Sequence, residues 1–198
     1  MSLVDLLNQS LGFVVGIIAS WIFMYSVQFL KPKLEISPVL VYNPEKNRLN
    51  IKVVNAGRRQ VIDVETNSSM LQKRFKGDGF KTELVKELEI LGPLSLALSP
   101  LQDLDNPWAV TNGRIFQIRD GIEALLLFHE KHEEERRIIF RIVATHSLSG
   151  VREAQQVTYK LNDIRIGIYG RRLTVLEQKN GPSIVQLIEE AKAKQANP

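Results

Sequence analysis

The stretch LGFVVGIIASWIFMYSVQFL, from Leu11 to Leu30, decides the architecture of this protein. Its only clearly polar side chains belong to Ser20, Ser26 and Gln28. An α-helix rises about 1.5 Å per residue, so about 20 residues cross a hydrocarbon layer that is about 30 Å thick. The run ends abruptly at Lys31-Pro32-Lys33. We therefore predict a membrane-spanning helix at 11–30, preceded by a tail at 1–10 and followed by a folded domain.

A cleaved signal peptide and the core helix of a soluble protein are the two alternatives for this run. A signal peptide needs a basic start and a cleavage site between small residues. Here Asp5 is the only charged side chain before the run, and Phe29-Leu30-Lys31-Pro32 offers no such site. A core helix would carry a polar stripe, which the run lacks. We expect an uncleaved anchor.

The charges that flank the run predict its orientation. Lys31 and Lys33 follow it directly, no basic residue precedes it, and basic flanks stay on the cytoplasmic side. We therefore expect a single-pass protein of the cell (inner) membrane with its N-terminus outside and its C-terminal domain in the cytoplasm. Anionic headgroups attract basic residues near the bilayer. The residues expected to contact headgroups are Lys31, Lys33, Arg171 and Arg172.

Small residues recur every fourth position in the run, at Gly12, Gly16 and Ser20. This spacing places them along one helix face, where two backbones can approach closely. Glycine is common in spanning helices, so chance also produces such a stripe. We expect helix–helix packing here and a homo-oligomer as its result.

Composition limits the function of the domain that follows. The chain has 198 residues and a net charge of +4, and all 26 Lys and Arg residues lie at or beyond Lys31. The basic residues are scattered without an aromatic stripe beside them, which argues against a nucleic-acid partner. The absence of cysteine excludes disulfides, thiol catalysis and cysteine-ligated metals. The lipid bilayer and another membrane protein remain as expected partners.

Short alternating segments separated by turn residues predict a mainly β domain at 33–176. Leu49, Ile51 and Val53 alternate with Asn50 and Lys52, as in a half-buried strand. We expect further strands at 61–68, 124–129 and 137–146. Two more buried faces are predicted, formed by Ile138, Phe140, Ile142 and Ala144 and by Gln155, Val157, Tyr159 and Leu161. Many short strands at even spacing favour an antiparallel sandwich.

The end of the chain predicts a short helix and tail at 183–198. Ser183 followed three residues later by Gln186 is a capping-box pattern. One apolar face follows it, made by Ile184, Leu187, Ile188 and Ala191.

Two stretches together resemble a known domain. LNIKVVNAGRRQVIDVETNSSM (Leu49–Met70) is a strand, an Asn-centred basic turn and a second strand. SGVREAQQVTYKLNDIRIGIYG (Ser149–Gly170) is a turn, a strand with Tyr159, and then Asp163-Ile164 and Gly167. In this order, behind a membrane helix, they resemble the cytoplasmic immunoglobulin-like sandwich of inward-rectifier potassium channels.

The resemblance implies an immunoglobulin-like sandwich on the cytoplasmic side that oligomerises or senses a ligand. It does not imply a pore, because a potassium channel needs a carbonyl-lined filter between two helices. This chain has one such helix and no TVGYG-type loop.

No cluster of residues predicts catalysis or a cofactor. The run His129–Glu135 could bind a divalent metal, but Lys131 interrupts it and a solvated hairpin explains it equally well. Asp103, Asp105 and Asn106 lack the rest of a calcium loop. Residues 76–79 are too short for a phosphate loop, and no nucleophile motif surrounds His146-Ser147. We expect no catalytic, cofactor-binding or metal residues and a non-enzymatic interaction, sensing or oligomerisation module. The alternatives are an accessory subunit of a channel or membrane-disrupting complex and a membrane-tethered enzyme.

Overall fold

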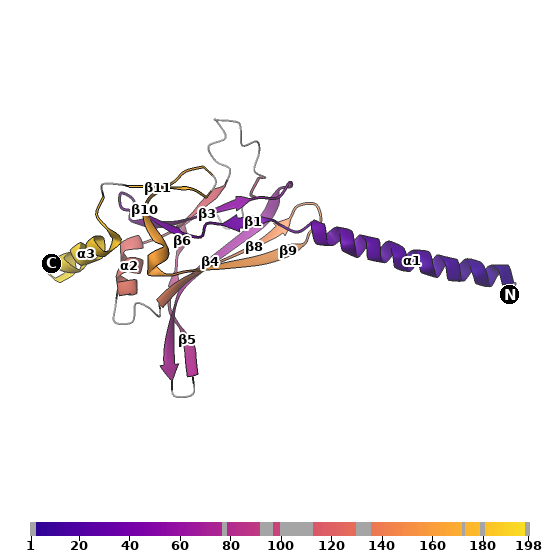
Figure 1. Cartoon of the computed structure of the whole chain (residues 1–198), viewed down its shortest axis with the longest axis horizontal. Coiled ribbons are helices and arrows are strands. Elements are labelled where there is room, and N and C mark those ends of the chain that lie inside the picture. Colours follow the sequence, from indigo (N-terminus) through magenta and orange to yellow (C-terminus); the bar gives the residue numbers. More distant parts are fainter. Residues whose placement is uncertain are drawn as a thin grey trace.

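Two β-sheets pack face to face behind a long N-terminal helix in the computed structural model, which describes residues 3–76, 79–91, 97–99, 113–129, 136–171, 173–178 and 181–196 (Figure 1). The helices are α1 (Leu3–Phe29), α2 (Gly121–His129) and α3 (Ile184–Ala196), with a 3₁₀ turn at Leu161–Asp163. The strands are β1 (Leu34–Ile36), β2 (Leu40–Asn43), β3 (Arg48–Asn55), β4 (Val61–Lys76), β5 (Gly79–Leu88), β6 (Ile90–Leu91), β7 (Arg114–Ile118), β8 (Arg136–His146), β9 (Arg152–Tyr159), β10 (Ile164–Tyr169) and β11 (Val175–Glu177).

The larger sheet has seven strands in the order β11-β10-β2-β3-β7-β6, with β1 also paired to β3. The smaller sheet has four strands in the order β5-β4-β8-β9. All described pairs are antiparallel except that of β10 with β2. The predicted mainly β sandwich with an N-terminal apolar helix and a short C-terminal helix is therefore confirmed, apart from this one parallel pair.

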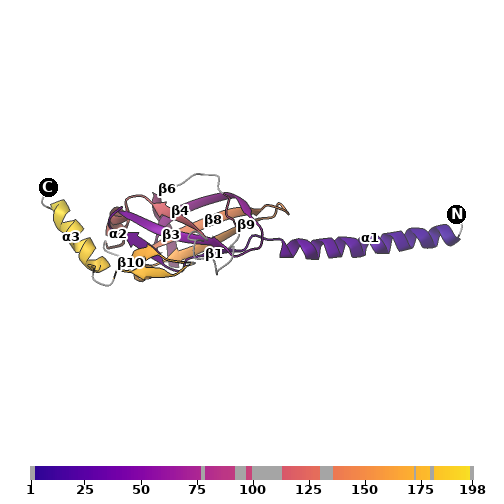
Figure 2. The ribbon, with the colours of Figure 1, turned by 90° about the horizontal axis from the view of Figure 1, so that it is seen from above.

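The core lies between the inner faces of the two sheets. Phe116 on β7 meets Phe140 on β8 with ring centroids 5.7 Å apart. The faces predicted from alternation are confirmed, because Leu49, Ile51 and Val53 are buried and so are Ile138, Phe140, Ile142 and Ala144. Figure 2 shows α1 at one end of the sandwich and α3 at the opposite end.

The strand predicted at 124–129 is wrong, because these residues belong to α2. Ala124, Leu125 and Phe128 are buried, which is the spacing of a helix face. A distant residue caps the helix: Asn47 accepts hydrogen bonds from Gly121 N through its carbonyl (2.9 Å) and from Ile122 N through Oδ1 (2.8 Å). A six-residue apolar run cannot distinguish strand from helix, and this cap is invisible to local patterns.

Three element boundaries complete the comparison with sequence. Helix α1 begins at Leu3 rather than Leu11, and its most apolar window runs from Gln9 to Ser26. Strand β4 continues to Lys76, where it and β5 form an arm that projects from the sandwich (Figure 1). The capping box is confirmed, since Ser183 N donates to Gln186 Oε1 (2.7 Å) and Gln186 N to Ser183 Oγ (3.2 Å).

Candidate functional site at the helix–sandwich junction

The junction between α1 and the sandwich is held by contacts from both sheets. Only residues 30–33 separate α1 from β1. The hydroxyl of Ser149, in the β8–β9 turn, donates to the carbonyl of Leu30 (2.7 Å). Ala56 N, in the β3–β4 turn, donates to the carbonyl of Lys33 (2.7 Å). Pro32 between them is buried. Hydrogen bonds from two turns of the sandwich therefore hold the segment that follows α1.

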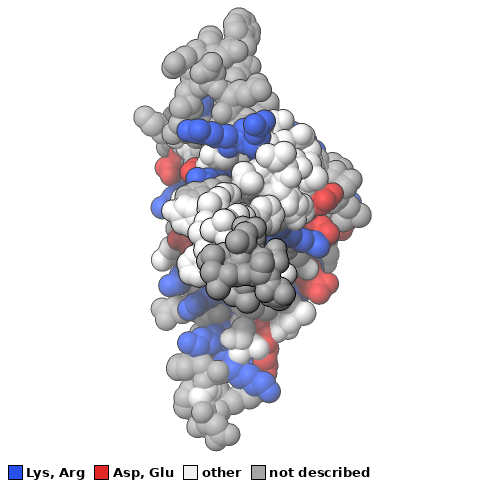
Figure 3. Space-filling view, turned by 90° about the vertical axis from the view of Figure 1, so that its right-hand side faces the viewer, with Lys and Arg blue, Asp and Glu red and all other residues white. Residues whose placement is uncertain are grey.

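Basic side chains gather at this end of the sandwich. Lys31, Lys33, Arg58 and Arg59 are exposed, and within the described ranges none of them forms an ion pair. Figure 3 views the molecule along α1 and shows Lys and Arg around the helix, with less Asp and Glu between them. Leu148, beside Ser149, is 67% exposed. A basic rim with an exposed apolar residue fits the polar surface of a bilayer.

Two tyrosine hydroxyls donate to backbone carbonyls between β1 and β2. Tyr159 is fully buried and its hydroxyl donates to the carbonyl of Ser37 (2.7 Å). The hydroxyl of Tyr169 donates to the carbonyl of Val39 (2.5 Å). Burial raises the pKa of Tyr159 above its usual range and raises that of Tyr169 to about 12. Both phenols are therefore neutral hydrogen-bond donors at neutral pH, which is a structural role.

A buried lysine lies on the outer face of the seven-stranded sheet. Lys52 was expected on a solvated face, yet it is only 4% exposed, and Asn50 on the same face is 8% exposed. Its Nζ donates to the carbonyl of Gly170 (2.6 Å), beyond the end of β10. Burial lowers the pKa of Lys52. Sequence alternation could not show that the β10–β11 hairpin lies against this face.

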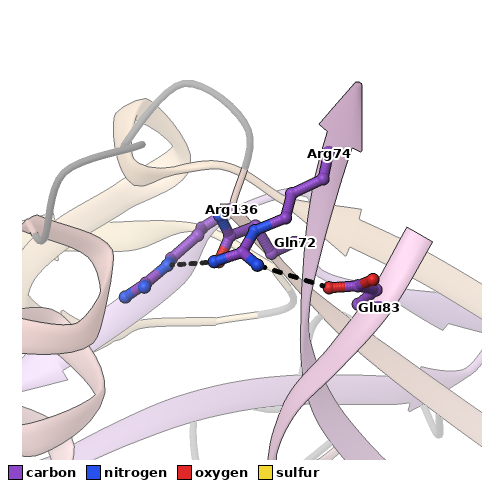
Figure 4. A network of polar contacts seen from close by, with 4 residues as sticks. All are labelled: Gln72, Arg74, Glu83 and Arg136. Carbon is purple, nitrogen blue, oxygen red and sulfur yellow. Dashed lines mark hydrogen bonds and ion pairs between the residues drawn. The ribbon is translucent and has the colours of Figure 1, made fainter. Parts of the chain in front are cut away.

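A polar network joins the smaller sheet to α2 (Figure 4). The guanidinium of Arg136, 8% exposed, donates to Gln72 Oε1 (3.4 Å) and to the carbonyl of Leu127 in the last turn of α2. Arg74 and Glu83 form an ion pair of 3.7 Å nearer the surface. Because Arg136 satisfies a carbonyl at a helix end, this network stabilises α2.

The structure places the predicted packing residues on the exposed surface of α1. A Cβ atom added to Gly12 or Gly16 would meet nothing within 4 Å, and Ser20 turns its hydroxyl to the carbonyl of Gly16 (2.8 Å). Within Gln9–Ser26 no residue is buried. Packing of a second helix against this stripe remains a prediction.

The structure describes three of the four residues predicted to contact lipid, and these three lie in two different segments. Lys31 and Lys33 are at the junction. Arg171 is exposed in the turn after β10, next to the residue that accepts the Lys52 hydrogen bond. Arg172 lies outside the described residues. Sequence reasoning missed Arg58 and Arg59 because only folding brings their turn beside Lys33.

The described part of the chain contains no cluster of three or more His, Asp or Glu that could hold a metal ion. Residues 130–135 and Asp103, Asp105 and Asn106 lie outside the described residues. Ser147 is exposed, and His146 faces Ser149 with Nδ1 3.1 Å from its Oγ.

Comparisons with known proteins do not place this chain in a family. No family model matches this chain, and no curated protein does. Among solved structures, the crystal structure of the periplasmic chaperone SfaE matches with a TM-score of 0.36 and 8% identity, over 73% of this chain. The match spans 60% of the chaperone. These comparisons do not show the predicted resemblance to inward-rectifier domains, which stays a prediction from the two sequence motifs; the structure forms these motifs as β3–β4 and β9–β10.

Proposed function

We propose that this chain is a single-pass membrane protein whose cytoplasmic β-sandwich is a non-enzymatic interaction, sensing or oligomerisation module. One observation carries the proposal: the 27-residue helix α1 has an apolar window in which no residue is buried. Water would make so much exposed apolar surface costly, whereas a bilayer solvates it.

The junction supports the same function. In Figures 1 and 2, α1 extends from one end of the sandwich, so a spanning α1 places that end, with Lys31, Lys33, Arg58 and Arg59, against the headgroups. The ends of α2 and α3 then face away from the bilayer, where a partner has access. The basic flank favours the cytoplasmic side for the sandwich.

Two measurements test the anchor and its orientation. We expect the full chain to stay with membranes in alkaline carbonate and to leave them only in detergent. We also expect a reporter that works only in the cytoplasm to be active when it is fused after Pro198. Extraction by carbonate would contradict the anchor, and activity of a periplasm-only reporter would contradict the orientation.

The headgroup contact has a separate test, made easy by the absence of native cysteine. A spin label at Leu148→Cys, in nanodiscs with anionic lipid, should be shielded from a water-soluble relaxant compared with one at Val185→Cys on α3. Arg58→Glu with Arg59→Glu should reduce the shielding. Equal exposure of the two labels would contradict the contact.

An accessory subunit of a channel or other membrane complex is the second candidate. The order of the two motifs behind an apolar helix supports this candidate. The described residues contain one helix that could span a bilayer, so a pore would have to come from a partner. Cross-linking in native membranes should then join the chain to a pore-forming protein. Cross-links only to a second copy would favour the self-associating module.

A further inference from the structure

The residue that follows α1 is held by a residue from a distant part of the sequence. The last carbonyls of a helix have no partner within the helix. Leu30 directly follows α1, and its carbonyl accepts a hydrogen bond from the hydroxyl of Ser149 (2.7 Å), although 119 positions separate the two residues. This is a side-chain cap supplied by the β8–β9 turn, and it depends on one hydroxyl group.

The turn that carries Ser149 is itself built to hold that hydroxyl in place. Gly150 N donates to the carbonyl of His146 (3.0 Å), and His146 N donates to the carbonyl of Val151 (2.9 Å). Gly150 has a φ of +68°, a conformation that glycine adopts without strain. The amide of Val151 donates to Ser149 Oγ (3.3 Å). The hydroxyl oxygen therefore accepts from its own turn while it donates to the helix.

His146 lies directly behind the hydroxyl. The residue is 6% exposed, and its Nδ1 is 3.1 Å from Ser149 Oγ and 3.3 Å from Ser149 N. Ser149 has one hydroxyl proton, which Leu30 O receives, so Nδ1 either donates its own proton to Oγ or accepts the amide proton of Ser149. Either arrangement fixes Ser149 against the sheet.

The β3–β4 turn also contacts the segment between α1 and β1. Ser147 N donates to the carbonyl of Gln60 (3.2 Å), which joins the β8–β9 turn to the β3–β4 turn. In the β3–β4 turn, Ala56 N holds Lys33 O, and a Cβ on Gly57 would lie 3.6 Å from Lys33 Cβ. Residues 30–33 therefore meet both turns within a few ångströms.

We propose that the β8–β9 turn is a clasp that fixes the direction of α1 relative to the sandwich, with the Ser149 hydroxyl as its releasable contact. Displacement of the turn by anything that binds the smaller sheet would free the helix to swing, and movement of the helix would pull on the turn. The inference rests on the proposed function only for placing α1 in a bilayer.

The test measures the angle between helix and sandwich in the full chain. Spin labels at Leu11→Cys on α1 and Gln156→Cys on β9, both exposed, report one distance in nanodiscs, with labelled chains diluted in unlabelled ones. Leu11 lies 19 residues before Leu30, about 28 Å along the helix, so a swing of about 10° moves its label by about 5 Å.

We expect Ser149→Ala to broaden the distance distribution by about 5 Å or more. Ser149→Thr keeps the hydroxyl and should retain the wild-type width. The matched control Ser147→Ala alters an exposed neighbour in the same turn and should also retain it.

Two results would overturn the clasp. One is a wild-type distribution in Ser149→Ala, and the other is equal broadening in Ser149→Ala, Ser149→Thr and Ser147→Ala. Failure of the proposed function has a different signature: the Leu11 label would be exposed to a water-soluble relaxant and shielded from oxygen, whatever the width of the distribution.

Discussion

Replacing Tyr159 tests the packing between the two sheets most directly. This side chain fills fully buried space on β9, and its hydroxyl reaches the carbonyl of Ser37, at the break between β1 and β2. Tyr159→Phe removes only the hydroxyl, and Tyr159→Ala removes the ring as well. The pair of variants therefore separates the hydrogen bond from the packing.

The structure gives the size of both effects. Ser37 is fully buried, so Tyr159→Phe leaves its carbonyl without this donor, at a cost of about 1–3 kcal/mol. Removing a large buried aromatic ring costs about 3–5 kcal/mol. For a chain of this length each kcal/mol lowers Tm by about 2–4 °C, so Tyr159→Ala should lower it by about 6–20 °C.

Denaturant unfolding of the full chain in detergent, followed by circular dichroism of the β signal, measures these losses. Thr158→Ala, at an exposed position on the same strand, is the matched control and should change stability little. A loss below about 1 kcal/mol for Tyr159→Ala would refute the reasoning, because no packed core residue of this size is removed so cheaply. Equal losses for Tyr159→Phe and Tyr159→Ala would show that the ring contributes nothing.

Three further predictions concern assembly, pH and autonomy. Gly16→Ile should weaken the homo-oligomer in sedimentation equilibrium, whereas Val14→Ile on the opposite helix face should not. An association constant that is unchanged in Gly16→Ile would show that the copies contact each other through the sandwich instead. The stability advantage of wild type over Tyr169→Phe should be constant below about pH 10 and shrink above it, because tyrosine ionises near 10 in the unfolded chain but only at about 12 when buried. The pKa of Lys52 is lowered rather than raised, so the pH dependence of wild type alone mixes the two residues, and the difference between wild type and Tyr169→Phe isolates Tyr169. An advantage of wild type that grows with pH would contradict the raised pKa of Tyr169. Residues 33–198 should give a β-type spectrum and a cooperative melt, and an unfolded fragment would show that the sandwich needs its anchor.

Local patterns predicted the features whose causes are local. The capping box at Ser183 and Gln186 is closed by residues three positions apart, and the buried face of β8 follows from alternation within one strand. The inner face of β9 was predicted in the same way and is confirmed in part: Tyr159 is fully buried, Gln155 and Val157 are half-buried, and Leu161 lies beyond the strand in the 3₁₀ turn. The helix α1 was evident because most of its side chains from Leu11 onward are apolar.

The features that sequence reasoning missed all depend on distant partners. Helix α2 is capped at its start by Asn47 and near its end by Arg136, and neither residue belongs to the apolar run that was taken for a strand. Lys52 is buried because Gly170 lies over it, 118 positions later. Alternation tells which face of a strand a residue occupies, but not what covers that face.

The most consequential of these distant contacts converge on one segment. The chain between Leu30 and Lys52 receives hydrogen bonds from Ser149 and Tyr159 and donates one to Gly170, so residues near the end of the domain hold the residues that follow the anchor. Contacts of such high sequence separation carry a large loop-closure cost and form late in folding. A chain still lacking the β8–β9 turn would therefore have its helix but no fixed angle between helix and sheet. With α1 in a bilayer, as proposed, the completed sandwich would set the direction of α1, and a partner that binds the sandwich would act on the helix through the same three contacts.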